Sequence, residues 1–445
     1  MPVKDGVRAS IWVLVYLIVA LAPLPIGLIQ LDPSRGFIIN LSVALGFVGL
    51  SMLGLQFVLA ARSHRVNAPF GIDLVLQFHR QISYVALALI LLHPIVLFLL
   101  NSRFLSLLNI LDSPLRAKLA VTSVTALLVL IAISVWRTRL GLSYEAWQLL
   151  HWSLALVVVL TALLHVVLIG YYVSQPWEKA LWVAMTLGFI ALGIWVRIVK
   201  PLQRRKRRWR VLDVVPELGN TYTIRLQPVD PRAFGAHSFA FDPGQFAWIV
   251  TEKASPFALT YHPFSMSSSA ENTRTVSFTI KSAGHFTRDI AKLAPGTTVY
   301  IDGPWGDFSI DRHEGPGFVF IGAGVGVTPI LSMLLTLADR DDPRRCYVFL
   351  ANHDEQSITC RDKVEHLTSG LDLKVVHVLS RPSPGWTGET GHIDAKLLDR
   401  YLPPRRNRLQ YFICGPTAMM DSAEAALAEL GVPAEQIHSE RFAMV

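Results

Sequence analysis

Two stretches of the chain carry a histidine at each end and almost only apolar residues between. Residues 79–93 read HRQISYVALALILLH, and residues 151–165 read HWSLALVVVLTALLH. Fourteen residues bring a helix to within about 40° of a whole number of turns and advance it by ~21 Å. Both rings of one stretch therefore face the same way. Because a neutral imidazole is a common metal ligand, the spacing predicts two levels at which a pair of rings could meet.

The chemistry that fits two stacked pairs is haem ligation. A histidine inside an apolar span is costly and suggests a function, although a single one could simply bond a neighbouring helix. Zinc needs three or four ligands at one level, and a proton relay needs a carboxylate, which neither stretch has between its histidines. Two b-type haems would use His79 with His151 and His93 with His165. Arg80 is expected to pair with a haem propionate, with an ordinary basic loop residue as the alternative.

Long apolar runs must position these histidines. The chain has 445 residues, of which 52% are hydrophobic and 17% charged, and the apolar runs lie before about residue 200. A membrane span needs about 20 apolar residues. The first run lacks a small-x-small cleavage site, so a retained helix is expected rather than a signal peptide. The six candidate spans are roughly 11–30, 37–60, 74–100, 115–136, 147–173 and 178–199.

Basic residues predict the orientation. The run QRRKRRWR at 203–210 directly follows the last span. By the positive-inside rule the N-terminus and the C-terminal half lie in the cytoplasm, below the cell inner (plasma) membrane. A run in this position favours lipid contact over nucleic-acid binding. Three cysteines, Cys346, Cys360 and Cys414, have no metal-ligand spacing and are expected as reduced thiols.

The region after the basic run alternates in short β-like stretches. WRVLDVV, YTIRLQPV, FAWIV, VSFTI and TVYI are separated by Gly and Pro, which predicts a small antiparallel barrel. The stretch YHPFSMSSS adds a Pro-stiffened strand with a cluster of hydroxyls. In IKSAGHFT, Lys281, the permissive Gly284 and Thr287 could hold a phosphate.

The last third changes to an α/β pattern. GFVFIGAGVGVTPILSMLLTL is typical of a buried strand, a glycine loop and a helix. Gly322, Gly324 and Gly326 would let backbone N–H groups approach a pyrophosphate at the helix N-terminus. Thr328 and Pro329 are expected at the cap and in the first turn. Further strands are expected at CYVFLAN, LKVVHVLS and LQYFICG.

These motifs resemble known families. The helical half is similar to the transmembrane domain of the ferric reductase/NADPH oxidase family, whose haem histidines lie in the third and fifth spans. The rest resembles ferredoxin-reductase-like FAD and nucleotide domains. The resemblance implies that His262, Pro263, Phe264 and Ser265 lie along the flavin, and that the segment from Lys281 to Thr287 holds the FAD pyrophosphate.

The resemblance also implies where nicotinamide binds. The turn Cys414–Gly415–Pro416 would border it, and Phe442 would cover the flavin, so Cys414 and Phe442 are the predicted catalytic residues. Phe442 departs from the family because Ala-Met-Val follows it. A second departure is ANHDEQS, where NADPH-selective relatives have an arginine. Asp354 there favours a ribose hydroxyl, although Arg361 or Arg381 could compensate.

The expected protein is a multidomain membrane protein. It has a six-helix transmembrane bundle (1–200), an antiparallel β-barrel FAD domain (207–313) and an α/β NAD(P)-binding domain (314–445). Electrons from NAD(P)H would pass through FAD and two haems b to an external acceptor. Dioxygen is favoured because it needs no binding loop, and a ferric chelate is the alternative. A haem-free membrane-anchored flavin reductase and a six-span transporter with a regulatory domain leave the paired histidines unexplained. The oligomeric state stays open.

Overall fold

The protein consists of two compact units in the computed structural model, Met1–Pro201 and Leu202–Val445. Each unit is described by itself. The boundary at residue 313 between the FAD domain and the nucleotide domain stays a prediction. The structure describes residues 3–28, 36–61, 70, 72–234, 239–251, 262–272 and 274–441.

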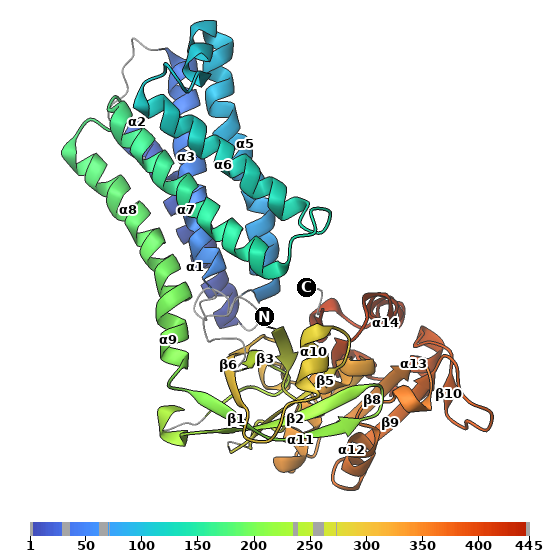
Figure 1. Ribbon diagram of the computed structural model, residues 1–445. Helices are drawn as coiled ribbons and strands as arrows, with labels where there is room; N and C mark the ends of the chain where they lie inside the picture. The colour runs from blue at the N-terminus through green and yellow to red at the C-terminus, as the bar shows by residue number, and fades with distance from the viewer. Residues whose placement is uncertain are drawn as a thin grey trace. The chain divides into compact units, whose positions relative to one another are not determined.

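The first unit is a bundle of long helices (Figure 1). Six of the described helices are long and apolar enough to cross a membrane, which confirms the predicted spans. The first span starts earlier than predicted, at Gly6, and the sixth continues to Arg204. The helices are α1 (Val3–Leu21), α2 (Pro23–Leu28), α3 (Phe37–Ala60), α5 (Ile72–Leu100), α6 (Leu115–Val135), α7 (Tyr144–Ile169), α8 (Pro176–Ile194) and α9 (Lys200–Arg204), with a 3₁₀ helix at Ser102–Leu108 and a π turn at Trp195–Val199.

Buried serines connect neighbouring helices of the bundle. The Ser51 hydroxyl on α3 donates to the Val19 carbonyl on α1 at 2.7 Å. The Ser123 hydroxyl on α6 donates to the Val158 carbonyl on α7 at 3.0 Å. Small polar side chains of this kind let helices approach closely where water is absent. The bundle is therefore held by specific contacts as well as by apolar packing.

The second unit begins with a curled antiparallel sheet of six strands. Their order is β4-β3-β6-β1-β2-β5, and the two edges meet at a bridge between Met266 and Phe278. Trp209, the aromatic residue of the basic run, is buried inside this sheet. The end of the basic run therefore belongs to strand β1. The antiparallel FAD-domain fold is confirmed. The strands are β1 (Arg208–Glu217), β2 (Thr221–Pro228), β3 (Phe246–Thr251), β4 (His262–Ser265), β5 (Val276–Lys281) and β6 (Thr298–Trp305).

A parallel sheet follows, with strand order β10-β9-β8-β7-β11-β12. Alternate residues of β7 face opposite sides: Phe318 and Phe320 pack with α11, whereas Val319 and Ile321 pack with α13 and α14. Both faces are therefore covered, as parallel sheets require. The strands are β7 (Gly317–Ala323), β8 (Arg345–Asn352), β9 (Leu373–Leu379), β10 (Glu389–Thr390), β11 (Gln410–Cys414) and β12 (Ile437–Glu440). The helices are α10 (His285–Ile290, in the FAD domain), α11 (Val327–Asp339), α12 (Arg361–His366), α13 (Ala395–Tyr401) and α14 (Thr417–Glu429).

Two histidine rings stack at the edge of this parallel sheet. The ring centres of His313 and His438 are 3.5 Å apart, with an interplanar angle of 24°. His438 Nε2 also lies 2.9 Å from Gln410 Oε1. Burial lowers the pKa of His313 to about 4. Burial, and then the like charge of His313, lower the pKa of His438 to about 3.

The stacked pair predicts a loss of stability in acid. Both rings bind protons more weakly in the folded state, so their contribution is complete above pH ~6.5 and is lost as the pH falls below it. We expect the unfolding midpoint of the second unit to fall between pH 7.5 and pH 5, and to fall less in His313→Phe, which keeps a ring without a charge. Intrinsic fluorescence during heating measures this. His366→Gln, at an exposed position on α12, is the control. Equal pH dependence in the wild type and His313→Phe would contradict the prediction.

Candidate functional site

The structure brings His79 on α5 and His151 on α7 together. Their ring centres are 6.5 Å apart, and their planes are inclined by 45°. Two imidazoles that bind one metal ion from opposite sides, through bonds of about 2 Å, have ring centres about 6 Å apart. The spacing of this pair therefore suits one metal ion held between two rings.

The other two histidines have their ring nitrogens oriented by backbone carbonyls. His93 Nδ1 lies 2.9 Å from the Ser42 carbonyl oxygen, and His165 Nδ1 lies 2.7 Å from the Arg116 carbonyl oxygen. A carbonyl can only accept, so in both rings Nδ1 carries the proton. Nε2 then keeps the lone pair that a metal needs. Gly46 makes room for this arrangement, because a Cβ there would lie 3.2 Å from His93 Cγ.

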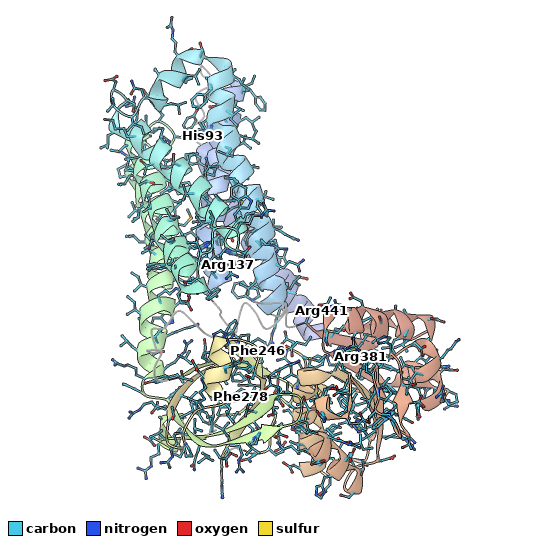
Figure 2. All side chains as sticks on the ribbon, turned by 45° about the vertical axis from the view of Figure 1, so that its right-hand side comes forward. His93, Arg137, Phe246, Phe278, Arg381 and Arg441 are labelled. Carbon is cyan, nitrogen blue, oxygen red and sulfur yellow. The ribbon has the colours of Figure 1, made fainter. Side chains whose placement is uncertain are left out.

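The rest of the donor set also fits paired haem ligands. In the described part of the chain, no group of three or more His, Cys, Asp or Glu side chains is placed to hold a metal ion, as a zinc site would require. His79 Nδ1 is buried and has no hydrogen-bond partner among the described residues. Arg80 follows it on α5 with an exposed side chain. Figure 2 places His93 and Arg137 at different levels of the helical unit.

The strand β4 carries the residues predicted to lie along a flavin. The ring of His262 stacks on Phe286 of α10, with centres 4.0 Å apart and an angle of 23°. Phe264 is nearly parallel to Phe286, at 6.2 Å and 8°. Pro263 lies between His262 and Phe264 in the chain. The Ser265 hydroxyl is buried without a hydrogen-bond partner among the described residues, and a flavin edge would supply one.

The predicted pyrophosphate segment forms a tight turn. Lys281 ends β5 with an exposed side chain, and Gly284 precedes α10. The Thr287 hydroxyl accepts from the N–H groups of Ala283 at 3.0 Å and Gly284 at 2.8 Å. It also lies 3.1 Å from the Gly284 carbonyl, to which it donates. Thr287 therefore shapes the turn.

The glycine loop joins β7 to α11, and one detail corrects the sequence prediction. Gly322 lies in β7, and Gly324–Gly326 form a 3₁₀ turn that runs directly into α11. The N-cap is Gly326, so Thr328 is wrong as the cap residue. Thr328 lies inside the first turn because the helix starts at Val327, and its hydroxyl donates to the Val325 carbonyl at 2.8 Å. Pro329 follows it in the first turn and is buried.

The end of β11 places a thiol beside a carboxylate. Cys414 is fully buried and is paired in register with Glu440 of β12. Burial raises the pKa of the Cys414 thiol well above its ordinary value, and Glu440 adds to the rise. Cys414 is therefore a neutral thiol. Gly415 and Pro416 follow it, and Pro416 caps α14. Phe442, the predicted flavin cover, lies outside the described residues.

Sequence reasoning missed Glu440. It is a largely buried carboxylate, 8% exposed, two residues before Phe442. The available signal was an acidic residue in the segment HSERF, close in the sequence to the predicted flavin cover. Its position opposite Cys414 follows only from the parallel pairing of β11 with β12.

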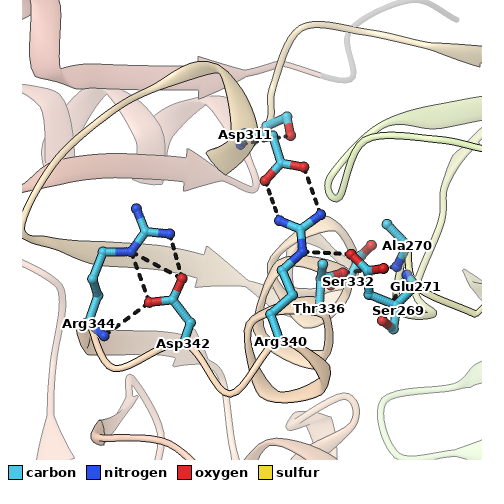
Figure 3. A network of polar contacts seen from close by, with 10 residues as sticks. Ser269, Ala270, Glu271, Asp311, Ser332, Thr336, Arg340, Asp342 and Arg344 are labelled. Atoms are coloured by element: carbon cyan, nitrogen blue, oxygen red, sulfur yellow. Dashed lines mark hydrogen bonds and ion pairs between the residues drawn. The ribbon is translucent and has the colours of Figure 1, made fainter.

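One stripe of α11 links the FAD sheet to the nucleotide sheet (Figure 3). Ser332, Thr336 and Arg340 recur every four residues, so they share one face of the helix. The contacts are Ser332 Oγ to the Ser268 carbonyl (2.7 Å), Ala270 N–H to Thr336 Oγ1 (2.9 Å), and Arg340 to Glu271 and to Asp311 (2.6 Å each). The helix that begins at the glycine loop therefore also holds the chain that continues from β4.

Known proteins resemble about half of the chain. The reductase subunit of stachydrine N-demethylase from Rhizobium meliloti (strain 1021) is 30% identical over 234 residues, 51% of this chain and 64% of that protein. The reductase component of propane 2-monooxygenase from Rhodococcus jostii (strain RHA1) is 28% identical over 242 residues, 53% of this chain and 63% of that protein. The chain thus spans less than two thirds of these relatives.

A solved structure also matches about half of the chain. The FAD/NAD binding domain of nitric oxide dioxygenase from Vibrio cholerae O1 biovar El Tor is 24% identical, with a TM-score of 0.47, and the match covers 53% of this chain and 98% of that one.

Three family models match successive parts of the chain. The ferric reductase like transmembrane component matches residues 45–162, the FAD-binding domain matches 218–309, and the oxidoreductase NAD-binding domain matches 320–425. The first covers the third span and most of the fifth. With this order of domains and six apolar helices, the chain is a multi-pass membrane oxidoreductase with the ferric reductase/NADPH oxidase architecture.

Proposed function

We propose that the chain carries electrons from NAD(P)H, through FAD and two b-type haems, to an acceptor across the membrane, and that the acceptor is dioxygen, which becomes superoxide. The observation that carries the proposal is the pairing of His79 with His151 at 6.5 Å. The proton positions at His93 and His165, which leave both Nε2 atoms available, support the second pair. When bound, FAD and haem supply the conversion of a hydride donor into single-electron transfers.

The residues of this chain supply ligation, orientation and insulation. His79 and His151 would hold one haem, His93 and His165 would hold the other, and Arg80 would pair with a propionate. The β4 segment His262–Ser265 would support the flavin, and Lys281–Thr287 its pyrophosphate. The glycine loop Gly322–Gly326 would receive the nucleotide pyrophosphate at the start of α11.

The remaining nucleotide contacts lie at the end of β11. Cys414, Gly415 and Pro416 would border the nicotinamide, and Phe442, which lies outside the described residues, would cover the flavin. The neutral, buried Cys414 thiol offers an uncharged surface to the ring. Glu440, beside it, is a further polar group at this edge.

The orientation and the acceptor are part of the proposal. The basic run at 203–210 favours a cytoplasmic second unit at the cell inner membrane. At the other end of the bundle, the described connections at 101–114 and 170–175 are short, which suits dioxygen because it needs no binding loop. The match to a ferric reductase component favours a ferric chelate as the second candidate acceptor.

A visible spectrum of the purified full-length protein tests the cofactors. We expect two b-type haems and one FAD per chain, because four ligands form two pairs and there is one FAD sheet. A protein with intact FAD and no haem would overturn the proposal in favour of a haem-free flavin reductase.

An assay in sealed vesicles tests the acceptor. NAD(P)H is supplied on the side of the second unit, and superoxide and ferrous iron are measured on the other side. Superoxide formation that continues without iron supports dioxygen. Reduction of a ferric chelate that superoxide dismutase does not inhibit, without superoxide, assigns the second candidate.

The turn after β8 bears on the choice between NADH and NADPH. Asp354 Oδ1 accepts the Ser357 N–H at 2.9 Å and so caps a short 3₁₀ turn. The hydroxyl of Ser383 donates to Glu355 and holds the pKa of that carboxyl below its ordinary value. Two carboxylates therefore lie in the segment proposed to face a 2′-phosphate, and both would disfavour its binding.

The two arginines considered as compensation differ in their surroundings. Arg361 Nε forms an ion pair with Glu365 at 2.8 Å. Arg381 lies just beyond β9, where its backbone N–H donates to the His353 carbonyl at 2.7 Å. Figure 2 labels Arg381 in the nucleotide domain. Arg381 is thus the stronger candidate for contact with a phosphate.

We expect kcat/KM to be equal for the two nucleotides or higher for NADH. Glu355→Gln removes one exposed like charge, so it should raise kcat/KM for NADPH roughly two- to fivefold and leave kcat/KM for NADH unchanged. Steady-state kinetics with both nucleotides measure this, with Glu429→Gln on α14 as the control. A hundredfold preference of the wild type for NADPH would contradict the expectation.

A further inference from the structure

We propose that Ser134 of α6 is a positioning residue for His151, that it sets the tautomer of this ring, and that it lowers the reduction potential of the haem held by His79 and His151. The inference rests on the proposed function, since it concerns one of the two haem sites. It concerns a contact between helices α6 and α7 that the spacing of the histidines does not reveal.

Three polar groups converge on the Ser134 hydroxyl oxygen. It lies 2.7 Å from the Leu130 carbonyl oxygen, 3.0 Å from His151 Nδ1 and 3.3 Å from Trp147 Nε1. All of these residues lie in the bundle, at the level of the His79–His151 pair. The Ser134 hydroxyl is therefore the hydrogen-bond partner that all three groups share.

The atom that carries each proton follows from whether its neighbours can donate or accept a hydrogen bond. A carbonyl only accepts and an indole N–H only donates, whereas a hydroxyl has one proton and two lone pairs. Ser134 gives its proton to Leu130, its shortest contact, and so accepts from both Trp147 and His151. His151 Nδ1 must therefore carry a proton. This leaves Nε2 with the lone pair directed at a metal.

Trp147 is itself held in place by aromatic and cationic contacts. Its ring centre lies 5.3 Å from His151 and 5.4 Å from Tyr144. The Arg137 guanidinium lies 5.7 Å from the Trp147 ring and 5.5 Å from the Tyr144 ring, as in cation–π pairs. These contacts keep the indole N–H directed at Ser134, so the hydroxyl stays turned to Leu130.

The hydrogen-bond partner of His151 differs from those of the other three histidines. His93 and His165 donate to backbone carbonyls. The Ser42 hydroxyl also lies 3.0 Å from His93 Nδ1, but it gives its own proton to the His93 carbonyl at 2.7 Å. His79 Nδ1 has no partner in the described part of the chain. A substitution of Ser134 therefore changes the hydrogen bond of His151 and leaves the surroundings of the other three histidines intact.

A hydrogen bond from Nδ1–H makes the imidazole a more basic ligand, which favours the ferric over the ferrous state. Without it, the ratio of ferrous to ferric haem at that site should rise roughly tenfold at a given ambient potential, which is about 59 mV for a one-electron couple. The other haem should not change.

The test is a redox titration of the full-length protein, followed by haem absorption, on three variants. Ser134→Ala removes the acceptor, and we expect one of the two haem transitions to shift upward by about 59 mV. Ser134→Thr keeps a hydroxyl and should restore the wild-type value. Ser123→Ala is the matched control, because Ser123 is also a buried serine of α6 bonded to α7, but to the Val158 carbonyl.

Each outcome is decisive. A shift in one transition with Ser134→Ala, restored by Ser134→Thr and absent in Ser123→Ala, supports the inference. Two unshifted transitions in Ser134→Ala overturn it and leave the proposed function intact. Equal shifts in Ser134→Ala and Ser123→Ala also overturn it, because they indicate a general effect of helix packing. A wild-type protein without haem contradicts the proposed function itself.

Discussion

His93→Ala protein should keep one haem and lose the other. The substitution removes a ligand nitrogen and also the bond from Nδ1 to the Ser42 carbonyl, so nothing orients a replacement ligand at that level. His79, which pairs with His151, lies about 21 Å from His93 along the helix. We expect haem content to fall from two per chain to one, and electron transfer across the membrane to fall to background.

The measurement is extracted haem per chain, together with vesicle reduction assays. Transfer from NAD(P)H to a soluble dye that takes electrons directly from the flavin is the internal control and should be unchanged. His165→Ala should give the same loss, since it removes the partner ligand. Loss of both haems from a correctly folded protein would argue against two separate levels.

Gly326→Ala should nearly abolish the use of NAD(P)H. Gly326 has an ordinary helical conformation, with φ of −63°, so alanine causes no backbone strain. However, its Cβ would lie 2.3 Å from the Cys414 carbonyl oxygen and 2.9 Å from Gly415 Cα. Both are backbone atoms of the turn proposed to border the nicotinamide, so the glycine loop and that turn must separate. A misplacement near 1 Å can cost about 100-fold in rate.

We therefore expect kcat/KM for NAD(P)H to fall about 100-fold, while chemical reduction of both haems by dithionite stays as in the wild type. Stopped-flow flavin reduction measures the first, and haem spectra measure the second. Gly370→Ala is the control, because a Cβ there meets no atom within 4 Å. Unchanged flavin reduction in Gly326→Ala would show that this close approach does not matter to the site.

Much of the architecture follows from local properties of the chain. The thickness of the bilayer sets a length of about 20 apolar residues for each span, so the six long helices could be predicted from runs of residue types. The pitch of a helix predicts that His79 and His93 face one way. Alternation in short stretches predicted strands of the antiparallel sheet, and apolar stretches predicted β7, β8, β9 and β11 of the parallel sheet, whereas β10 and β12 were not predicted. Each of these signals lies within one short window of the sequence.

The tertiary structure alone decided the contacts between distant residues. Ser134 lies 17 residues from His151, and Ser42 lies 51 residues from His93, so the proton positions on these rings depend on how the helices pack. Likewise, Glu440 reaches Cys414 only because β12 pairs with β11 in parallel register. Thr328 was expected as a cap because of its residue type, yet the preceding turn runs unbroken into α11 and the helix begins after Gly326. Spacing along the sequence predicted the elements and the levels of the ligands, whereas packing between elements determined which atom of each side chain is available for chemistry.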